Sequence, residues 1–145
     1  MRFRHLHLIR YGSFKDRLLD FPAEDGDFQL IYGSNEAGKS TTRDAVSDLL
    51  FGFEQRNPYG FLHDLSSLRI GAELEHDKQK LKFERKKGNR ETLRDMNDEA
   101  LPDSVLALYL GTGDREFFAR MFSLNHQQLR SGGREILDAK DDVGR

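Results

Sequence analysis

Apolar and polar residues alternate in short runs over much of the first hundred positions, which is typical of strands with one buried face. A compact apolar run at 28–32 predicts a fully buried strand, and residues 53–66 predict a loop with a short helical piece. Between residues 40 and 51 the apolar spacing becomes i, i+1, i+4, i+5, which predicts a helix that ends at Gly52. The predicted strands are 3–9, 18–21, 28–32, 68–75, 80–86 and 91–96.

After Pro102 the pattern becomes helical. Asp114 is the predicted N-cap of a helix over 115–122, and further helical stretches are expected at 105–110 and 127–137. The apolar residues of the 115–122 helix fall at i, i+1, i+4, i+5, and we predict that they form a core stripe rather than an interface. These residues are Phe117, Phe118, Met121 and Phe122.

Together the two patterns predict an α/β fold in a single lobe with three parts. Residues 1–52 would supply strands, a glycine loop and its helix, residues 53–100 an antiparallel β-rich part, and residues 101–145 a small helical part. A length of 145 residues suits one domain, or one lobe of a larger one.

The composition excludes several classes of protein. With 23 Lys and Arg against 25 Asp and Glu, the net charge of −2 gives no overall attraction to nucleic acid or anionic lipid. The chain has no cysteine, which excludes a disulfide framework, a Cys-ligated zinc site and a thiol nucleophile. We find neither an apolar run of the roughly 18 residues that a membrane span needs nor a signal peptide, so we expect a cytoplasmic protein.

One motif carries specific chemistry. Residues 33–40 read GSNEAGKS and match GxxxxGK[ST] at every fixed position, between a predicted strand and a predicted helix. Glycines at both ends let successive backbone N–H groups turn inward, and the helix adds the positive end of its dipole, so the loop can cradle an anion. A glycine turn that merely connects strand and helix is the alternative. The residues expected to bind nucleotide here are Gly33, Ser34, Asn35, Glu36, Ala37, Gly38, Lys39, Ser40 and Thr41.

The motif predicts binding of a nucleotide with Mg²⁺. Lys39 would place its ammonium against the β- and γ-phosphates, the Ser40 hydroxyl would be a Mg²⁺ ligand, and Thr41 would touch the α-phosphate. A hydrolase of this class also needs an acidic residue at the end of a second buried strand. No run of four apolar residues in the sequence ends in Asp or Glu. The chain therefore holds half of a nucleotide site.

Three segments, 1–21, 28–52 and 121–129, resemble the N-terminal head lobe of SMC-like ABC ATPases of the YhaN type, to which SbcC and the double-strand-break-repair ATPases are related. In such proteins a long coiled coil divides the head, and the C-terminal lobe brings the signature motif, the Walker B acid and the switch histidine. The resemblance implies that this lobe binds ATP and Mg²⁺ as half of a split head, that it becomes an ATP hydrolase with the C-terminal lobe, and that alone it is poorly active. It further implies an ATP-dependent homodimer of heads and a role in DNA repair or chromosome maintenance.

The resemblance also places further site residues. His126 falls at the position of the Q-loop residue, which holds Mg²⁺ or its water and senses the γ-phosphate, with Gln127 and Gln128 as alternatives. An imidazole there would respond to pH near neutrality. An arginine that often follows the first strand of repair-type heads is not matched here, so nucleotide contacts from that loop would come from Ser13 or Lys15.

Three weaker signals have competing interpretations. Residues 129–133 read LRSGG, like an ABC signature, but only 12 residues follow, and we favour a helix break. The stretch 78–94 carries eight basic residues and suits either DNA contact or, as we favour, the solvated face of a hairpin. His5 and His7 share a strand face and could bind a metal, but no third ligand is evident, and a surface role is favoured.

Two rival functions come from other classes. A complete small P-loop kinase or GTPase would need a Walker B acid and, for a GTPase, an N-K-x-D base reader, and we find neither motif. A non-hydrolysing module that binds DNA or a partner protein would carry the loop as a vestige.

Overall fold

The computed structural model describes residues 1–22 and 28–122, and the chain forms two compact units, residues 1–113 and 114–145. The first unit contains a five-stranded sheet and a long helix, and the described part of the second is one helix. The strands are β1 (Arg2–Tyr11), β2 (Phe14–Asp20), β3 (Arg69–His76), β4 (Gln79–Lys86) and β5 (Leu93–Arg94), and the helices are α1 (Lys39–Phe51), α2 (Ala107–Leu110) and α3 (Arg115–Phe122). Short 3₁₀ turns span Leu65–Ser67 and Asp103–Leu106.

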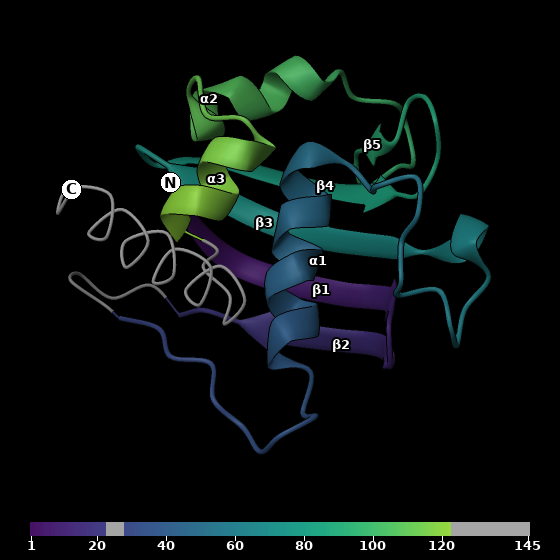
Figure 1. Cartoon of the computed structure of the whole chain (residues 1–145). Helices are drawn as coiled ribbons and strands as arrows, with labels where there is room; N and C mark the ends of the chain where they lie inside the picture. The colour runs from purple at the N-terminus through teal and green to yellow at the C-terminus, as the bar shows by residue number, and fades with distance from the viewer. Residues whose placement is uncertain (23–27, 123–145) are drawn as a thin grey trace, which may run out of the picture. The chain divides into compact units, whose positions relative to one another are not determined.

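The sheet is antiparallel throughout, in the order β2-β1-β3-β4-β5 (Figure 1). Strands from residues 1–52 and from residues 53–100 therefore join in one sheet. Asp77 and Lys78 both have positive φ in the turn between β3 and β4, as the tight turns of hairpins require. The predicted strands at 68–75 and 80–86 and the helix at 40–51 are confirmed within a residue or so.

Helix α1 lies across one face of the sheet, and the core forms between them (Figure 1). Alternation along the strands puts Leu6, Ala72 and Phe83 in one cross-strand row, and all three are buried. Ala45 and Leu49 on α1 are fully buried. Since burial of a large apolar side chain contributes about 1.5–3 kcal/mol, this interface fixes the helix to the sheet.

The C-terminal end of α1 is held by Gly52 and by a buried arginine on β4. The Gly52 N–H donates to the Asp48 carbonyl at 2.9 Å, and Gly52 has φ 91°. Arg85, which is 2 % exposed, donates from Nε to the Leu49 carbonyl at 2.6 Å, and its guanidinium also reaches the Leu50 carbonyl at 3.4 Å. Carbonyl groups in the last turn of a helix have no intrahelical donor, and the Arg85 guanidinium donates to these two. Its positive charge also complements the negative end of the helix dipole.

The opposite face of the sheet is polar and carries a row of alternating charges. Asp20, His5, Glu73 and Lys82 are successive cross-strand partners on β2, β1, β3 and β4. Glu73 is buried in this row, 3.1 Å from the Lys82 ammonium and 3.6 Å from that of Lys80. Burial alone would raise the pKa of Glu73, but the two lysines outweigh it and hold the pKa below its ordinary value.

Replacing Glu73 with glutamine is expected to lower the free energy of unfolding by up to about 1 kcal/mol at pH 7. Because the folded-state pKa is depressed, the carboxylate stabilises the fold above its unfolded-state pKa, and this stabilisation is lost as pH falls through the folded-state value. The gap between wild type and Glu73→Gln should therefore close below about pH 4. Urea denaturation at pH 7 and pH 3 measures the difference in free energy of unfolding between the two proteins. A difference as large at pH 3 as at pH 7 would contradict the ion-pair explanation.

The prediction of a buried strand at 28–32 is wrong. The segment is not a strand, and all five of its side chains are exposed, Phe28 and Tyr32 each to 86 %. An apolar run becomes a buried strand only if neighbouring strands pair with it on the sheet. Among the described residues, the five strands of the antiparallel sheet pair with one another and none pairs with 28–32.

In the second unit, the predicted cap of α3 is confirmed and its predicted core stripe is wrong. The Phe117 N–H donates to Asp114 Oδ1 at 2.8 Å. Phe117, Met121 and Phe122 are exposed, and the ring of Phe122 contacts those of Phe117 and Phe118. An i, i+4 stripe needs an opposing apolar surface to be buried, and the sequence of the helix alone does not supply one.

Candidate nucleotide-binding site

The glycine loop leads directly into α1. Gly38 is the N-cap residue with φ 90°, in the left-handed region that favours glycine. From Thr42, both the backbone N–H and the hydroxyl donate to the Gly38 carbonyl, at 2.8 and 3.0 Å. Because Gly38 has no side chain to accept from the first-turn N–H groups, these donors remain available to an anion at the positive end of the helix dipole.

Lys39 folds back across the curve of the loop. Its Nζ donates to the carbonyls of Gly33 at 2.8 Å and Ser34 at 2.6 Å. The ammonium is thus held where a phosphate group bound in the loop would meet it. The Ser40 side chain is exposed, so its hydroxyl is accessible to a cation. An ammonium at the loop and an accessible hydroxyl oxygen at the start of a helix fit a phosphate with Mg²⁺.

Phe14, which the sequence analysis did not single out, packs against the loop. A Cβ placed on Gly38 would lie 2.3 Å from Cζ of the Phe14 ring, closer than real contacts allow. The aromatic ring from the start of β2 therefore rests directly on the glycine backbone and helps to fix the loop. The sequence motif already requires a glycine at position 38. The structure adds a second reason, because the Phe14 ring leaves no room for a side chain there.

Replacing Gly38 with alanine is expected to weaken phosphate binding by the loop about tenfold or more and to lower stability by about 1–3 kcal/mol, because the new Cβ meets Phe14 at a positive φ. Gly111→Ala is the matched control, since Gly111 also has positive φ (63°) but nothing within 4 Å of its Cβ position. Adding Phe14→Ala to Gly38→Ala should recover part of the loss. Thermal unfolding and ATP titration measure both effects. Because Gly111 (φ 63°, ψ −134°) also strains an added side chain, the affinity for ATP is the deciding readout, and an equal loss of affinity in the two glycine variants would contradict the steric explanation.

A hydrogen-bonded network ties the end of β1 and the loop that follows α1 to the α1 helix. The Tyr11 hydroxyl donates to Asp48 Oδ2 at 2.8 Å, and Asn57 Nδ2 donates to the same oxygen at 2.6 Å. The Tyr59 hydroxyl donates to Asp44, and its ring stacks on that of Tyr11. Burial and the neighbouring carboxylates raise the pKa of both tyrosines, Asp48 acting on Tyr11 and Asp44 on Tyr59, so both stay protonated donors.

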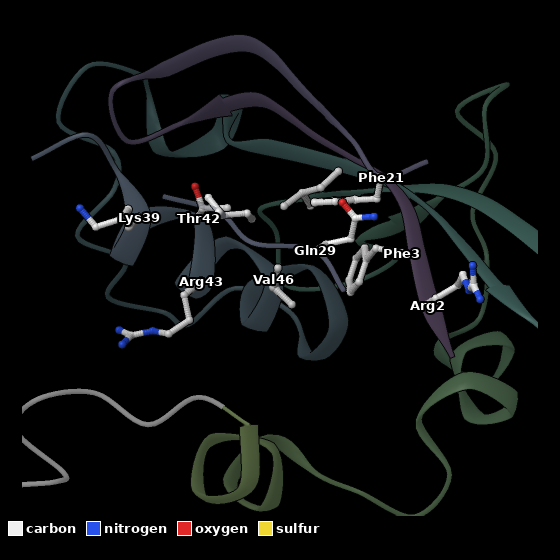
Figure 2. A pocket seen from close by; sticks show the side chains of 10 residues that line it. Arg2, Phe3, Phe21, Gln29, Lys39, Thr42, Arg43 and Val46 are labelled. Carbon is white, nitrogen blue, oxygen red and sulfur yellow. The ribbon is translucent and has the colours of Figure 1, made fainter. Parts of the chain in front are cut away.

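A cavity of about 510 Å³ opens beside the N-terminal half of α1 (Figure 2). It is lined by side chains from β1, α1 and the exposed 28–32 segment, among them Phe3, Gln29 and Val46. Lys39 and Arg43 lie along the same helix at its edge (Figure 2). The lining is mostly apolar, so this cavity is an unfilled part of the packing around the segment before the loop rather than a phosphate site.

Ser13 and Lys15, which are expected to contact the nucleotide from the loop after the first strand, lie on the surface near the phosphate loop. Ser13 lies in the turn between β1 and β2, and Lys15 on β2 pairs with Arg10 of β1; both side chains are exposed. Their contact with nucleotide stays a prediction. The Q-loop candidates His126, Gln127 and Gln128, the LRSGG segment at 129–133 and the predicted helix at 127–137 lie outside the described residues.

The basic stretch 78–94 is largely engaged within the fold. Five of its eight basic side chains have partners: Lys80 and Lys82 at Glu73, Arg85 at the end of α1, Lys87 at two carbonyls, and Arg94 at the Asp98 carbonyl. Arg85 is buried, so it cannot reach DNA. Contact with DNA through this stretch stays a prediction.

The two strand histidines face carboxylates. His7 Nε2 lies 2.7 Å from Asp16 Oδ1, and His5 Nδ1 lies 3.0 Å from Asp20 Oδ1. Within residues 1–22 and 28–122 no group of three or more His, Asp or Glu side chains is arranged to hold a metal ion. In the same part of the chain no helix is long and apolar enough to cross a membrane.

A GxxxxGK[ST] loop whose lysine folds back onto it at the start of a helix is the mark of the P-loop class of nucleotide-binding proteins. In agreement, the family described as "AAA domain" matches residues 1–145, and the chain belongs to this family. It is 33 % identical over 131 residues to the uncharacterized protein YhaN of Bacillus subtilis (strain 168), a match that covers 86 % of this chain and 13 % of YhaN. The chain corresponds to an N-terminal lobe of the YhaN type, and nucleotide binding of the ATPase type holds at the level of the family.

Proposed function

We propose that this chain binds ATP with Mg²⁺ through residues 33–41 as the N-terminal half of a split SMC-like ATPase head. The observation that carries the proposal is the position of Lys39, whose ammonium is held inside the loop by the Gly33 and Ser34 carbonyls at the start of a 13-residue helix. That position matches the place where phosphate charge must be neutralised.

Each residue of the loop has a distinct task in this proposal. The backbone N–H groups of the loop and of the first turn of α1 bind the β-phosphate, and Lys39 exchanges its two carbonyl acceptors for phosphate oxygens. The Ser40 hydroxyl would hold Mg²⁺, which would neutralise phosphate charge, and Thr41 would contact the α-phosphate. Phe14 and the Tyr11–Asp48 contact keep loop and helix in place.

The carboxylates of α1 are engaged in the fold and do not serve as the hydrolytic acid. Asp44 accepts from Tyr59 and from Arg43, and Asp48 accepts from Tyr11 and Asn57. A carboxylate that polarises the attacking water must be close to the γ-phosphate and free to accept from that water. In this proposal the C-terminal lobe of a longer protein supplies it, which is in line with the 13 % of YhaN that the match covers.

The exposure of the apolar segment 28–32 is a second observation in favour of a partner lobe. Phe28, Leu30 and Tyr32 are apolar or aromatic yet exposed, directly before the phosphate loop, and the apolar cavity lies beside them. Strands supplied by the C-terminal lobe would bury this segment and convert it to the strand that its sequence favours. An ATP-dependent pair of heads and work in DNA repair or chromosome maintenance belong to the same proposal and rest on the resemblance alone.

The rate of ATP hydrolysis tests whether the catalytic groups are divided between two lobes. This lobe mixed with the C-terminal half of its own full-length protein is expected to hydrolyse ATP at least about tenfold faster than either part alone, because two incomplete sets of catalytic groups become one. The same mixture made with Lys39→Ala should show no rise. If the lobe binds ATP but turnover stays at the sum of the separate parts, the split-site proposal is wrong while the nucleotide site remains.

A further inference from the structure

Phe61 is an exposed aromatic side chain on a loop that is firmly anchored. The side chain is 65 % exposed, and the residue follows Tyr59-Gly60 in the loop between α1 and β3. Single exposed apolar side chains are common on protein surfaces, so exposure alone assigns Phe61 no role, and its surroundings decide. The sequence alone shows only a loop at this position.

The loop is fixed on both sides of Phe61. Before it, the Tyr59 N–H donates to Asn57 Oδ1 at 2.9 Å, and the Tyr59 carbonyl accepts from the Gly12 N–H at 2.9 Å. After it, His63 Nε2 lies 2.9 Å from the carbonyl oxygen of Phe14. Phe61 is therefore held out from a rigid segment, which reduces the entropy lost when a ligand packs on it.

The same contacts place Phe61 next to the phosphate site. A Cβ at Gly12 would lie 2.9 Å from Cγ2 of Thr41, 3.3 Å from Cδ1 of Tyr59 and 3.9 Å from Cζ of Phe61. Gly12 is therefore the point where the end of the P-loop and the aromatic loop meet. Thr41 is the residue expected at the α-phosphate, the end of the triphosphate that carries the nucleoside.

We propose that Phe61 is the stacking surface for the base of the bound nucleotide. The inference rests on the proposed ATP site and extends it from the phosphates to the nucleoside. A nucleotide whose α-phosphate lies at Thr41 extends its sugar and base past Gly12, over the exposed ring. Every nucleobase has a π-face, so an aromatic ring binds bases by stacking with little selectivity. The site therefore distinguishes a nucleotide from inorganic polyphosphate rather than adenine from guanine.

Binding of ATP and of tripolyphosphate to Phe61→Ala tests the inference. The affinity for ATP should fall about tenfold, as expected for the loss of one stacked base, whereas the affinity for tripolyphosphate should stay unchanged. Leu62→Ala is the matched control: its side chain is adjacent, apolar and 66 % exposed, and its removal should alter neither affinity. Phe61→Tyr should retain the affinity for ATP.

Each other outcome overturns the inference in a recognisable way. Unchanged ATP affinity in Phe61→Ala would show that the base lies elsewhere, and an equal loss for both ligands would show that Phe61 only supports the loop. If wild type binds tripolyphosphate and ATP equally well, no base site exists although the phosphate site does; if it binds neither, the proposed function fails as well. Because the chain has no Trp, Phe61→Trp adds a direct readout: ATP should quench its fluorescence and tripolyphosphate should not.

Discussion

Replacing Lys39 with alanine is expected to weaken ATP binding by about 100-fold and to leave the fold intact. The ammonium makes charge-assisted hydrogen bonds to phosphate that no neighbouring side chain can replace, and such bonds contribute about 1.5–3 kcal/mol each. The side chain is exposed, and its ammonium donates to the Gly33 and Ser34 carbonyls, which solvent can satisfy once the lysine is gone. Isothermal titration with ATP measures the affinity, and thermal unfolding checks the fold.

Lys80→Ala is the control for charge. Lys80 is also an exposed lysine, but it lies on the polar face of the sheet beside Glu73, so its removal should leave the affinity for ATP unchanged. Equal affinities of Lys39→Ala and wild type would show that the loop does not bind phosphate. Equal losses in Lys39→Ala and Lys80→Ala would show that binding follows net charge alone.

The largest expected effect on stability is that of Arg85→Ala, a loss of about 2–5 kcal/mol. The arginine is buried, and its guanidinium donates to the Leu49 carbonyl, to Thr92 Oγ1 at 2.9 Å and to Asp103 Oδ1 at 2.7 Å. Its removal leaves carbonyls at the end of α1 without donors and opens a void beneath the helix. Urea denaturation measures the loss as a lower midpoint with an unchanged slope.

Arg90→Ala is the control for Arg85→Ala. Arg90 belongs to the same basic stretch of sequence but is exposed between β4 and β5, so its removal should change stability by no more than about 0.5 kcal/mol. Similar midpoints for the two variants would contradict the structural role assigned to Arg85. A low midpoint for Arg85→Ala alone would show that this cation belongs to the core and not to a nucleic-acid surface.

Local patterns predict those parts of the fold that local interactions determine. The hairpin of β3 and β4 follows from alternation interrupted by a polar turn, and α1 follows from its apolar stripe and the glycine that ends it. The phosphate loop is predictable for the same reason, because its chemistry depends on the spacing of glycines and a lysine within eight residues.

Features that depend on distant contacts could not be predicted. The apolar run 28–32 looks like a buried strand, but burial requires partner strands that local sequence does not encode. Arg85 looks like one of eight basic surface residues until the register of β4 turns it under α1. Phe14 and Phe61 carry no local signal, since their roles follow from contact with Gly38 and from proximity to Gly12.

The central claim is that Mg-ATP binds in the loop formed by residues 33–41. Backbone amide shifts in a ¹H–¹⁵N NMR titration test it most directly, because they report binding and its location together in a 16.8 kDa chain. We predict saturable shifts centred on these amides, with an affinity that rises when Mg²⁺ is added. No saturable shifts, or shifts confined to the polar face of the sheet around Glu73, would contradict the account.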